Sequence, residues 1–290
     1  MVPVYNGKKF INDFFKPLKD VETNFEAIFV DNGSSDGSFE VLREKCSEFR
    51  NFKVLKYTEK KSSYAARNFG VKNCSGEILF FTDIDCILSK EYLALLNNEK
   101  IKLEKNIITG PVDIFFQKKN LYEIFDKCAY LKQEEYVSLG YAVTANLIVS
   151  KKIFNEVGMF PEFTSGADNK FCKSCKKFGT DIIFKNELKV FHPARASKLE
   201  HQTKAKRLGY GQAEFFFYDE PSFLKIIFFL SKHLLLIIFP FNTLRLFFKV
   251  ILHEEFKRKN FFSTFTFIYN IGYLQRLEML KYLFTVHLKY

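Results

Sequence analysis

The first third of the chain alternates short runs of β-branched and aromatic residues with longer segments in which apolar residues recur every three or four positions. Runs of the first kind predict strands, and segments of the second kind predict helices. We expect strands at 27–30, 53–57 and 78–82, with helices at 38–49 and 65–73 between them. Strands that alternate with helices are typical of βαβ units, so the sequence predicts an α/β fold with a mainly parallel sheet.

Polar clusters follow two of these strands and a short run at the opening of the chain that we interpret as the end of a further strand. Asn6-Gly7 comes after that run, Asp31 to Gly37 after the strand at 27–30, and Asp83 to Asp85 after the strand at 78–82. Ligands bind at the carboxyl ends of parallel strands, so these clusters are the candidate binding loops.

The pair Asp83 and Asp85 is the candidate metal site. Residues two apart on an extended segment point to the same side, so both carboxylates can face one ion. Hard divalent cations such as Mg²⁺ take oxygen ligands and share them with a substrate's phosphates. The alternative is a solvated strand end or a cap for the next helix.

The cluster from Asp31 to Ser38 has two interpretations. As an ordinary turn, it would use Ser or Asp to cap the helix that follows. As a binding loop, it would place Asp31 at the strand end to accept hydrogen bonds from a uracil-like base or a ribose.

The character of the sequence changes near residue 220, which predicts a catalytic domain at 1–220 and an apolar, basic helical tail at 221–290. The stretch 223–241 has close to the roughly 20 residues needed to span a bilayer, but charged residues interrupt it. Lys225 and Lys232 share one helix face, which favours a helix lying on an acidic membrane surface. Alternatively, the tail helices pack on the catalytic domain or form a dimer interface.

The net charge of +11 indicates an anionic partner: nucleic acid, acidic lipid or a phosphorylated small molecule. Much of the excess lies in the tail, since residues 198–290 hold 14 Lys and Arg against 7 Asp and Glu. A protein that stacks single-stranded nucleic acid on its Phe and Tyr residues would explain the charge. It would not explain paired carboxylates at a strand end, so we expect no nucleic-acid partner.

The six cysteines are scattered, and no secretory signal peptide precedes them, which favours free thiols in a reducing compartment. Cys172 and Cys175 have the spacing of half a zinc site. No second pair accompanies them in the sequence, so we interpret them as two small residues on a helix.

Taken together, the motifs closely resemble, in order and spacing, the family 2 glycosyltransferases of the GT-A fold. The resemblance covers residues 2–215 and implies a nucleotide-sugar donor, an acceptor hydroxyl and transfer with inversion. It rests on these segments: Val2-Pro3-Val4-Tyr5-Asn6, Val30 to Gly37, Ala66-Arg67-Asn68-Phe69-Gly70, Ser75-Gly76-Glu77-Ile78, Phe81-Thr82-Asp83-Ile84-Asp85, Thr144 to Ile148 and Phe154 to Glu162.

The resemblance also implies roles for individual residues. The donor-binding residues would be Pro3, Val4, Tyr5, Asp31, Ser34, Arg67 and Asp83. Asp85 would ligate Mg²⁺ or Mn²⁺ directly, and Arg67 suits a phosphate, although a helix arginine can equally be a surface charge.

Two further positions take their roles from the resemblance. Relatives open a helix with Glu-Asp and use the Asp as catalytic base; here Ala167 replaces the Glu, and Asp168 is the base or an N-cap of a helix at 169–178. His192 stands where some relatives place a further metal ligand, or it is a hydrogen-bonded structural residue.

The segment 204–212 resembles the basic helix that follows the catalytic domain in rhamnosyltransferase-like relatives. The Gln-x-x-Arg-Trp signature of processive synthases is absent from the sequence, so we expect one sugar to be transferred per encounter. We expect a lipid-linked or saccharide acceptor, a role in cell-envelope or extracellular polysaccharide synthesis, and a location on the cytoplasmic face of the membrane, held peripherally or by one or two weak membrane segments. A catalytically degenerate membrane partner subunit is the alternative.

Overall fold

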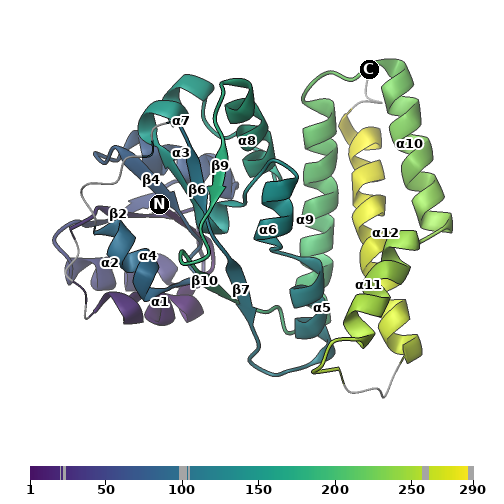
Figure 1. Ribbon diagram of the computed structural model, residues 1–290, viewed down its shortest axis with the longest axis horizontal. Coiled ribbons are helices and arrows are strands. Elements are labelled where there is room, and N and C mark those ends of the chain that lie inside the picture. The colour runs from purple at the N-terminus through teal and green to yellow at the C-terminus, as the bar shows by residue number, and fades with distance from the viewer. Residues whose placement is uncertain (20, 22–23, 98–102, 104, 257–260, 287–290) are drawn as a thin grey trace. The chain divides into compact units, whose positions relative to one another are not determined.

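The computed structural model describes residues 1–290 except 20, 22–23, 98–102, 104, 257–260 and 287–290 (Figure 1). The chain divides into two compact units, which we name the sheet unit and the helical unit. The sheet unit comprises Met1–Asp113, Leu131–Glu162 and Ala167–Pro193. The helical unit comprises Ile114–Tyr130, Phe163–Gly166 and Ala194–Tyr290.

The first sheet is parallel and confirms the expected α/β class. Its strands are β1 (Val2–Val4), β2 (Ala27–Asp31) and β3 (Phe52–Lys56), in the order β1-β2-β3. Its register sets Val4 beside Asp31 and Asp31 beside Lys56, so the carboxyl ends of the three strands are aligned. The residues that follow these strands therefore share one edge of the sheet.

The other strands form two sheets that contain antiparallel pairs. The larger has the order β4 (Ile78–Phe81), β8 (Leu147–Ser150), β6 (Ile107–Thr109) and β9 (Ile182–Phe184); β8 is antiparallel to both of its neighbours, and β9 is parallel to β6. The smaller has the order β5 (Ile87–Leu88), β10 (Val190–Pro193) and β7 (Val112–Phe115). β10 runs antiparallel to β5, which brings residues near 192 back to residues near 86.

Aromatic packing fills the core of the sheet unit. Phe15 stacks on Phe29 with ring centroids 5.2 Å apart, and Phe14 meets Phe29 edge to face at 5.5 Å. α3 (Ser63–Lys72) begins after Ser62, whose hydroxyl accepts from the backbone N–H groups of Tyr64 and Ala65. The remaining helices of this unit are α1 (Lys8–Phe15), α2 (Ser38–Ser47), α4 (Lys90–Leu96), α6 (Gln133–Ser138), α7 (Lys151–Val157) and α8 (Ala167–Lys177), with 3-10 turns at Lys16–Leu18 and Thr144–Asn146.

The helical unit is built on two long helices, α9 (Lys198–Phe217) and α12 (Phe261–Val286), which lie alongside each other (Figure 1). A Cβ atom at Gly209 of α9 would lie 2.0 Å from the Gln275 carbonyl oxygen of α12, so only glycine permits this close approach. The helical unit therefore includes α9 together with the segment expected to form the tail. α5 (Leu121–Ala129), α10 (Phe223–Ile238) and α11 (Phe241–Ile251) complete the unit.

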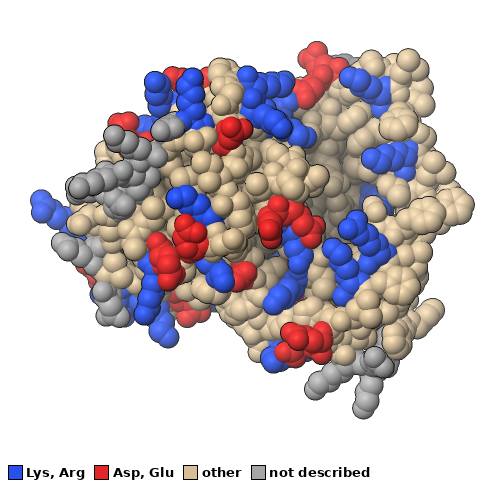
Figure 2. Space-filling view, in the orientation of Figure 1, with Lys and Arg blue, Asp and Glu red and all other residues tan. Residues whose placement is uncertain are grey.

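The helices α10 and α11 expose apolar side chains. α10 has no buried residue, and Phe223, Leu224 and Phe228 are at least 70% exposed. Figure 2 shows that the surface over α10 is largely uncharged and is broken by Lys and Arg side chains. Among the helices described, none alone has the length and apolar character to cross a membrane, whereas α10 and α11 together pass this test with a bend of 48° between them.

Candidate active site

Backbone-to-side-chain hydrogen bonds fix the loops after β1 and β2 to each other. Asn6, in a left-handed conformation with φ of +50°, donates its N–H to the Ser34 hydroxyl at 2.9 Å. The Ser35 N–H returns a bond to Asn6 Oδ1 at 2.8 Å, and the Gly7 N–H donates to the Ser38 hydroxyl at 2.9 Å. The two polar clusters noted in the sequence thus form one rigid rim at the sheet edge.

Asp31 ends β2 with a fully buried side chain. Its Oδ2 accepts from the N–H groups of Gly33 and Ser34, both at 3.2 Å. Its Oδ1 is buried and has no hydrogen-bond partner among the residues described. Leaving such an acceptor unpaired costs about 1–3 kcal/mol, so Asp31 is a position at which a ligand's N–H or O–H would be stabilised.

The predicted donor-binding residues of the first strand differ in what they can offer a ligand. Val4 is a core side chain, 1% exposed, and contributes its carbonyl, which accepts from the Asn32 N–H at 2.7 Å. Pro3 is half-buried. Tyr5 is 55% exposed, and the Lys61 ammonium lies 5.9 Å from the centre of its ring. Among these three, Tyr5 has the side chain that can reach a ligand.

Arg67 is a buried cation, 3% exposed, so the alternative that it is a surface charge is wrong. Its Nη2 donates to Asp83 Oδ1, and its guanidinium lies over the ring of Tyr64 with Cζ 5.6 Å from the centroid. Its buried Nε–H has no partner within the described part of the chain. α3 thus presents a partly satisfied positive charge beside the acidic pair.

Asp83 and Asp85 lie on a tight turn instead of an extended segment. The Cys86 N–H closes the turn by donating to the Asp83 carbonyl at 3.1 Å. Ligand atoms of Asp83, Asp85 and Cys86 still lie within 4.8 Å of one another. The two carboxylates can therefore face one ion, although the alternation of a strand is not what brings them together.

Cys86 is a neighbour of this centre that the sequence analysis did not single out, although it directly follows Asp85. It is fully buried, and burial together with the charges of Asp85 and Asp83 raises the pKa of its thiol well above the usual range. A thiol kept protonated is a poor metal ligand, because the thiolate is the form that binds metals.

His192 completes the candidate metal centre from β10. Its Nε2 lies 3.2 Å from Asp85 Oδ2, and its Nδ1 lies 2.7 Å from the Pro193 carbonyl oxygen. Because a carbonyl only accepts, Nδ1 must carry a hydrogen. The lone pair of Nε2 would then face a lone pair of Asp85 Oδ2, unless a proton or a cation lies between the two atoms. Carboxylate oxygens suit Mg²⁺ or Mn²⁺, and an imidazole nitrogen beside them favours the transition metal Mn²⁺, so the residues fit the expected divalent cation.

Asp168 is the second residue of α8, which begins at Ala167, so it lies inside the first turn and is not the N-cap. It is 6% exposed, and burial raises the pKa of its carboxyl. The Asn169 N–H donates to Oδ1 at 2.9 Å, and the Thr144 N–H donates to Oδ2 at 3.3 Å. The Tyr64 hydroxyl and the charge of Arg67 also favour the carboxylate and oppose that rise in pKa.

Tyr64 was missed by the sequence analysis. It is 5% exposed, hydrogen-bonds Asp168 and lies under the guanidinium of Arg67. Its spacing of three residues from Arg67 places both on one helix face, which was the available signal. By contrast, Cys172 and Cys175 are buried on α8, where burial raises the pKa of the Cys175 thiol to about 12, consistent with small packed residues.

Known proteins of similar sequence are glycosyltransferases. The sequence profile of "Glycosyl transferase family 2" matches residues 1–158. Glycosyltransferase AglE of Haloferax volcanii is 29% identical over 232 residues, covering 78% of this chain and 76% of AglE. Glycosyltransferase GlyG of Streptococcus pneumoniae is 23% identical over 175 residues, covering 54% of this chain and 58% of GlyG.

Solved structures share the fold. TarS 1-349 of S. aureus in complex with UDP-GlcNAc has a TM-score of 0.53 at 18% identity, covering 71% of this chain and 65% of that one. The mannosyltransferase PcManGT from Pyrobaculum calidifontis, solved with GDP-Man and Mn²⁺, has a TM-score of 0.54 at 13% identity. The match covers 95% of this chain and 85% of that one. These proteins have the GT-A-like fold, so the fold predicted from the sequence motifs is confirmed.

Proposed function

Because the chain belongs to glycosyl transferase family 2, we propose that it transfers a sugar from a nucleotide-diphosphate donor to an acceptor hydroxyl with inversion. Buried Arg67 carries this proposal. It bonds to Asp83 at the candidate metal centre, and its charge acts on the carboxyl of Asp168. The Arg67 guanidinium therefore interacts both with the site proposed for the diphosphate and with the carboxyl proposed as the catalytic base.

Donor binding would use the rim of the sheet. The unpaired Oδ1 of Asp31 would accept a hydrogen bond from the base or ribose, and Tyr5 and Ser34 lie on the same rim. Asp85 and His192, with Asp83 beside them, would hold the divalent cation. The cation would neutralise charge on the diphosphate that leaves.

Asp168 would act as the general base. Its carboxylate takes the proton of the acceptor hydroxyl while the hydroxyl oxygen bonds to the anomeric carbon from the face opposite the nucleotide. The bond between that carbon and the diphosphate oxygen breaks, and the electron pair leaves with the diphosphate. Tyr64 and the Thr144 N–H hold the carboxylate in place during proton transfer.

We assign the helical unit to the cytoplasmic face of a membrane, where a lipid-linked acceptor of cell-envelope or extracellular polysaccharide synthesis would be found. The exposed apolar side chains of α10 and α11 support this location. The segment 221–253 contains four Lys and Arg residues and no Asp or Glu, which suits an anionic surface.

The experiment that tests the function is a donor panel of UDP-, GDP- and dTDP-sugars with Mn²⁺ or Mg²⁺, followed by NMR. A donor consumed in a metal-dependent manner to give a product of inverted anomeric configuration supports the proposal. A retained configuration would contradict the role of Asp168, and consumption unaffected by chelator would contradict the metal centre.

A further inference from the structure

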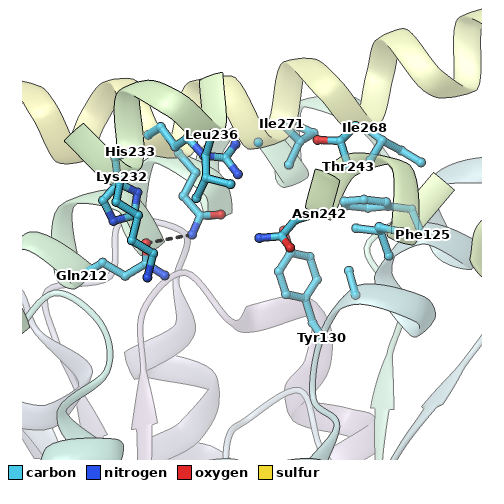
Figure 3. A pocket seen from close by; sticks show the side chains of 15 residues that line it. Phe125, Tyr130, Gln212, Lys232, His233, Leu236, Asn242, Thr243, Ile268 and Ile271 are labelled. Atoms are coloured by element: carbon cyan, nitrogen blue, oxygen red, sulfur yellow. Dashed lines mark hydrogen bonds between the residues drawn. The ribbon is translucent and has the colours of Figure 1, made fainter. Parts of the chain in front are cut away.

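A cavity of about 350 Å³ lies in the helical unit, lined by residues of α5, α9, α10, α11 and α12 (Figure 3). Its polar lining consists of basic, amide and hydroxyl side chains, and none of its lining residues is Asp or Glu. The polar groups that matter are Lys232, His233, Arg276, Gln212, Gln275 and Asn242. The cavity is distinct from the candidate active site, whose residues belong to the sheet unit.

Three basic side chains come close together in this cavity. The charges of Lys232 and Arg276 add to burial in lowering the pKa of His233 to about 4. Burial likewise lowers the pKa of the Arg276 guanidinium. Two cations near a neutral imidazole, with no carboxylate in the lining, create a positive potential inside the cavity.

Among the described residues, the three basic side chains lack acidic partners, a role that a bound ligand could fill. In the described part of the chain, no carboxylate forms an ion pair with Lys232 or Arg276. The Nδ1 atom of His233 is buried, and it has no hydrogen-bond partner among the residues described. Burial disfavours the charged form of the Arg276 guanidinium, and Lys232 adds a second positive charge at an exposed position, so an anion in the cavity would be stabilised.

The local backbone makes room for this arrangement. A Cβ atom at Gly272 would lie 3.0 Å from Nη1 of Arg276 and 3.6 Å from Oγ1 of Thr243. Glycine at this position therefore allows the guanidinium to fold beside α12. The Gln275 amide donates to Gln212 Oε1 at 3.1 Å and ties α12 to α9 at the cavity (Figure 3).

The surroundings indicate what kind of anion fits. Lys232 lines the cavity from α10, whereas Phe228 and Leu235 of the same helix are 70% and 56% exposed, and Phe241 of α11 is 68% exposed. Basic groups in a cavity beside an apolar surface match a ligand with an anionic head and an apolar chain.

We propose that this cavity binds the phosphate group of a membrane lipid, with the lipid's apolar chains along α10 and α11. The inference rests on the proposed membrane contact of the helical unit and is independent of sugar transfer. Arg276 supplies the forked pair of N–H donors that suits a phosphate, and Lys232 supplies a second charge.

Calorimetric titration of the full-length protein with dihexanoylphosphatidic acid, below its micelle concentration, tests the proposal. We expect saturable binding that Arg276→Gln weakens at least tenfold. Arg245→Gln removes the same charge from an exposed position of α11 outside the cavity, and it should change affinity less than twofold. Lys232→Gln, at an exposed position, provides a second cavity variant that should fold normally.

Two control ligands identify the source of the phosphate. Dihexanoylphosphatidylcholine should bind weakly, and inorganic phosphate should bind less tightly than the phosphatidic acid. Equal losses in Arg245→Gln and the cavity variants, or binding of phosphatidylcholine equal to that of phosphatidic acid, would overturn the proposal. Inorganic phosphate binding as tightly as the lipid would overturn the assignment to a lipid. Nucleotide binding in the same samples should remain unchanged, which separates this test from that of sugar transfer.

Discussion

The two units each bury a group of charges, and the groups differ in how completely they are satisfied. In the helical unit, the buried Asp126 carboxylate accepts from the backbone and guanidinium of Arg195 at 3.1–3.3 Å, with Lys204 4.0 Å away. In the sheet unit, Arg67 and Asp31 keep buried polar atoms without partners among the described residues. The carboxylate oxygens of Asp126 are paired, which suits a structural role, whereas the unpaired atoms of Arg67 and Asp31 leave room for a ligand's hydrogen bonds.

The largest expected effect comes from Asp168→Asn. Loss of the base should lower kcat by about 10²–10⁴-fold, while the Kd of the donor changes less than threefold. The measurement is steady-state transfer beside donor calorimetry. A mutant that loses donor affinity instead would place Asp168 in the nucleotide site.

The comparison of the two charge groups is tested directly by Arg67→Gln and Arg195→Gln. Arg67→Gln should lower kcat/KM by at least about tenfold, because one good charge-assisted contact contributes about 1.5–3 kcal/mol. Arg195→Gln should leave kcat/KM within about threefold and instead lower the Tm, because breaking a buried ion pair costs about 3–5 kcal/mol. Similar kinetics in the two variants would remove the distinction between them.

The pH dependence offers a finer test. Burial raises the pKa of the Asp168 carboxyl, and this carboxyl must be ionised to act as a base. We therefore expect kcat/KM to fall tenfold per pH unit on the acid side of its pH profile, with a midpoint above the usual pKa of a carboxyl group. A raised folded-state pKa stabilises the fold below the carboxyl's unfolded pKa, and this stabilisation is lost as pH rises through the folded value. Asp168→Asn should therefore stabilise the protein more at pH 8 than at pH 3.5, as measured by urea unfolding.

The smallest effect is expected from the apolar surface. Phe228→Ser on α10 removes an exposed ring, so it should leave the Tm within about 1–2 °C and weaken binding to phosphatidylglycerol vesicles severalfold. Leu199→Ser on α9, also exposed, is the matched control outside α10 and α11. Loss of folding in the first variant, or equal loss of vesicle binding in both, would favour a packing or dimer role for α10.

Local patterns predicted much of the fold. The strands at 27–30 and 78–82 and the helices at 38–49 and 65–73 fall within two residues of β2, β4, α2 and α3. The extent of the helical unit was not predictable, because it depends on the close approach of Gly209 to Gln275 across 66 positions.

The site shows the same limit. Motifs predicted Asp85, His192 and Asp168, but the 3.2 Å contact between His192 and Asp85 depends on the pairing of β10 with β5. The unpaired Oδ1 of Asp31 and the hydrogen bond from Tyr64 to Asp168 also depend on the tertiary structure. Sequence periodicity reports which face a residue takes, not which atoms remain without partners.

The most direct test of the central claim is calorimetric binding of UDP, GDP and dTDP to the full-length protein, with Mn²⁺ and then with chelator. We expect one nucleotide to bind at least tenfold more tightly with Mn²⁺, and Asp85→Asn to abolish that difference. Binding of every nucleotide that is as tight in chelator as with Mn²⁺, or a Mn²⁺ effect that survives in Asp85→Asn, would contradict the claim that the turn after β4 holds the metal and the diphosphate.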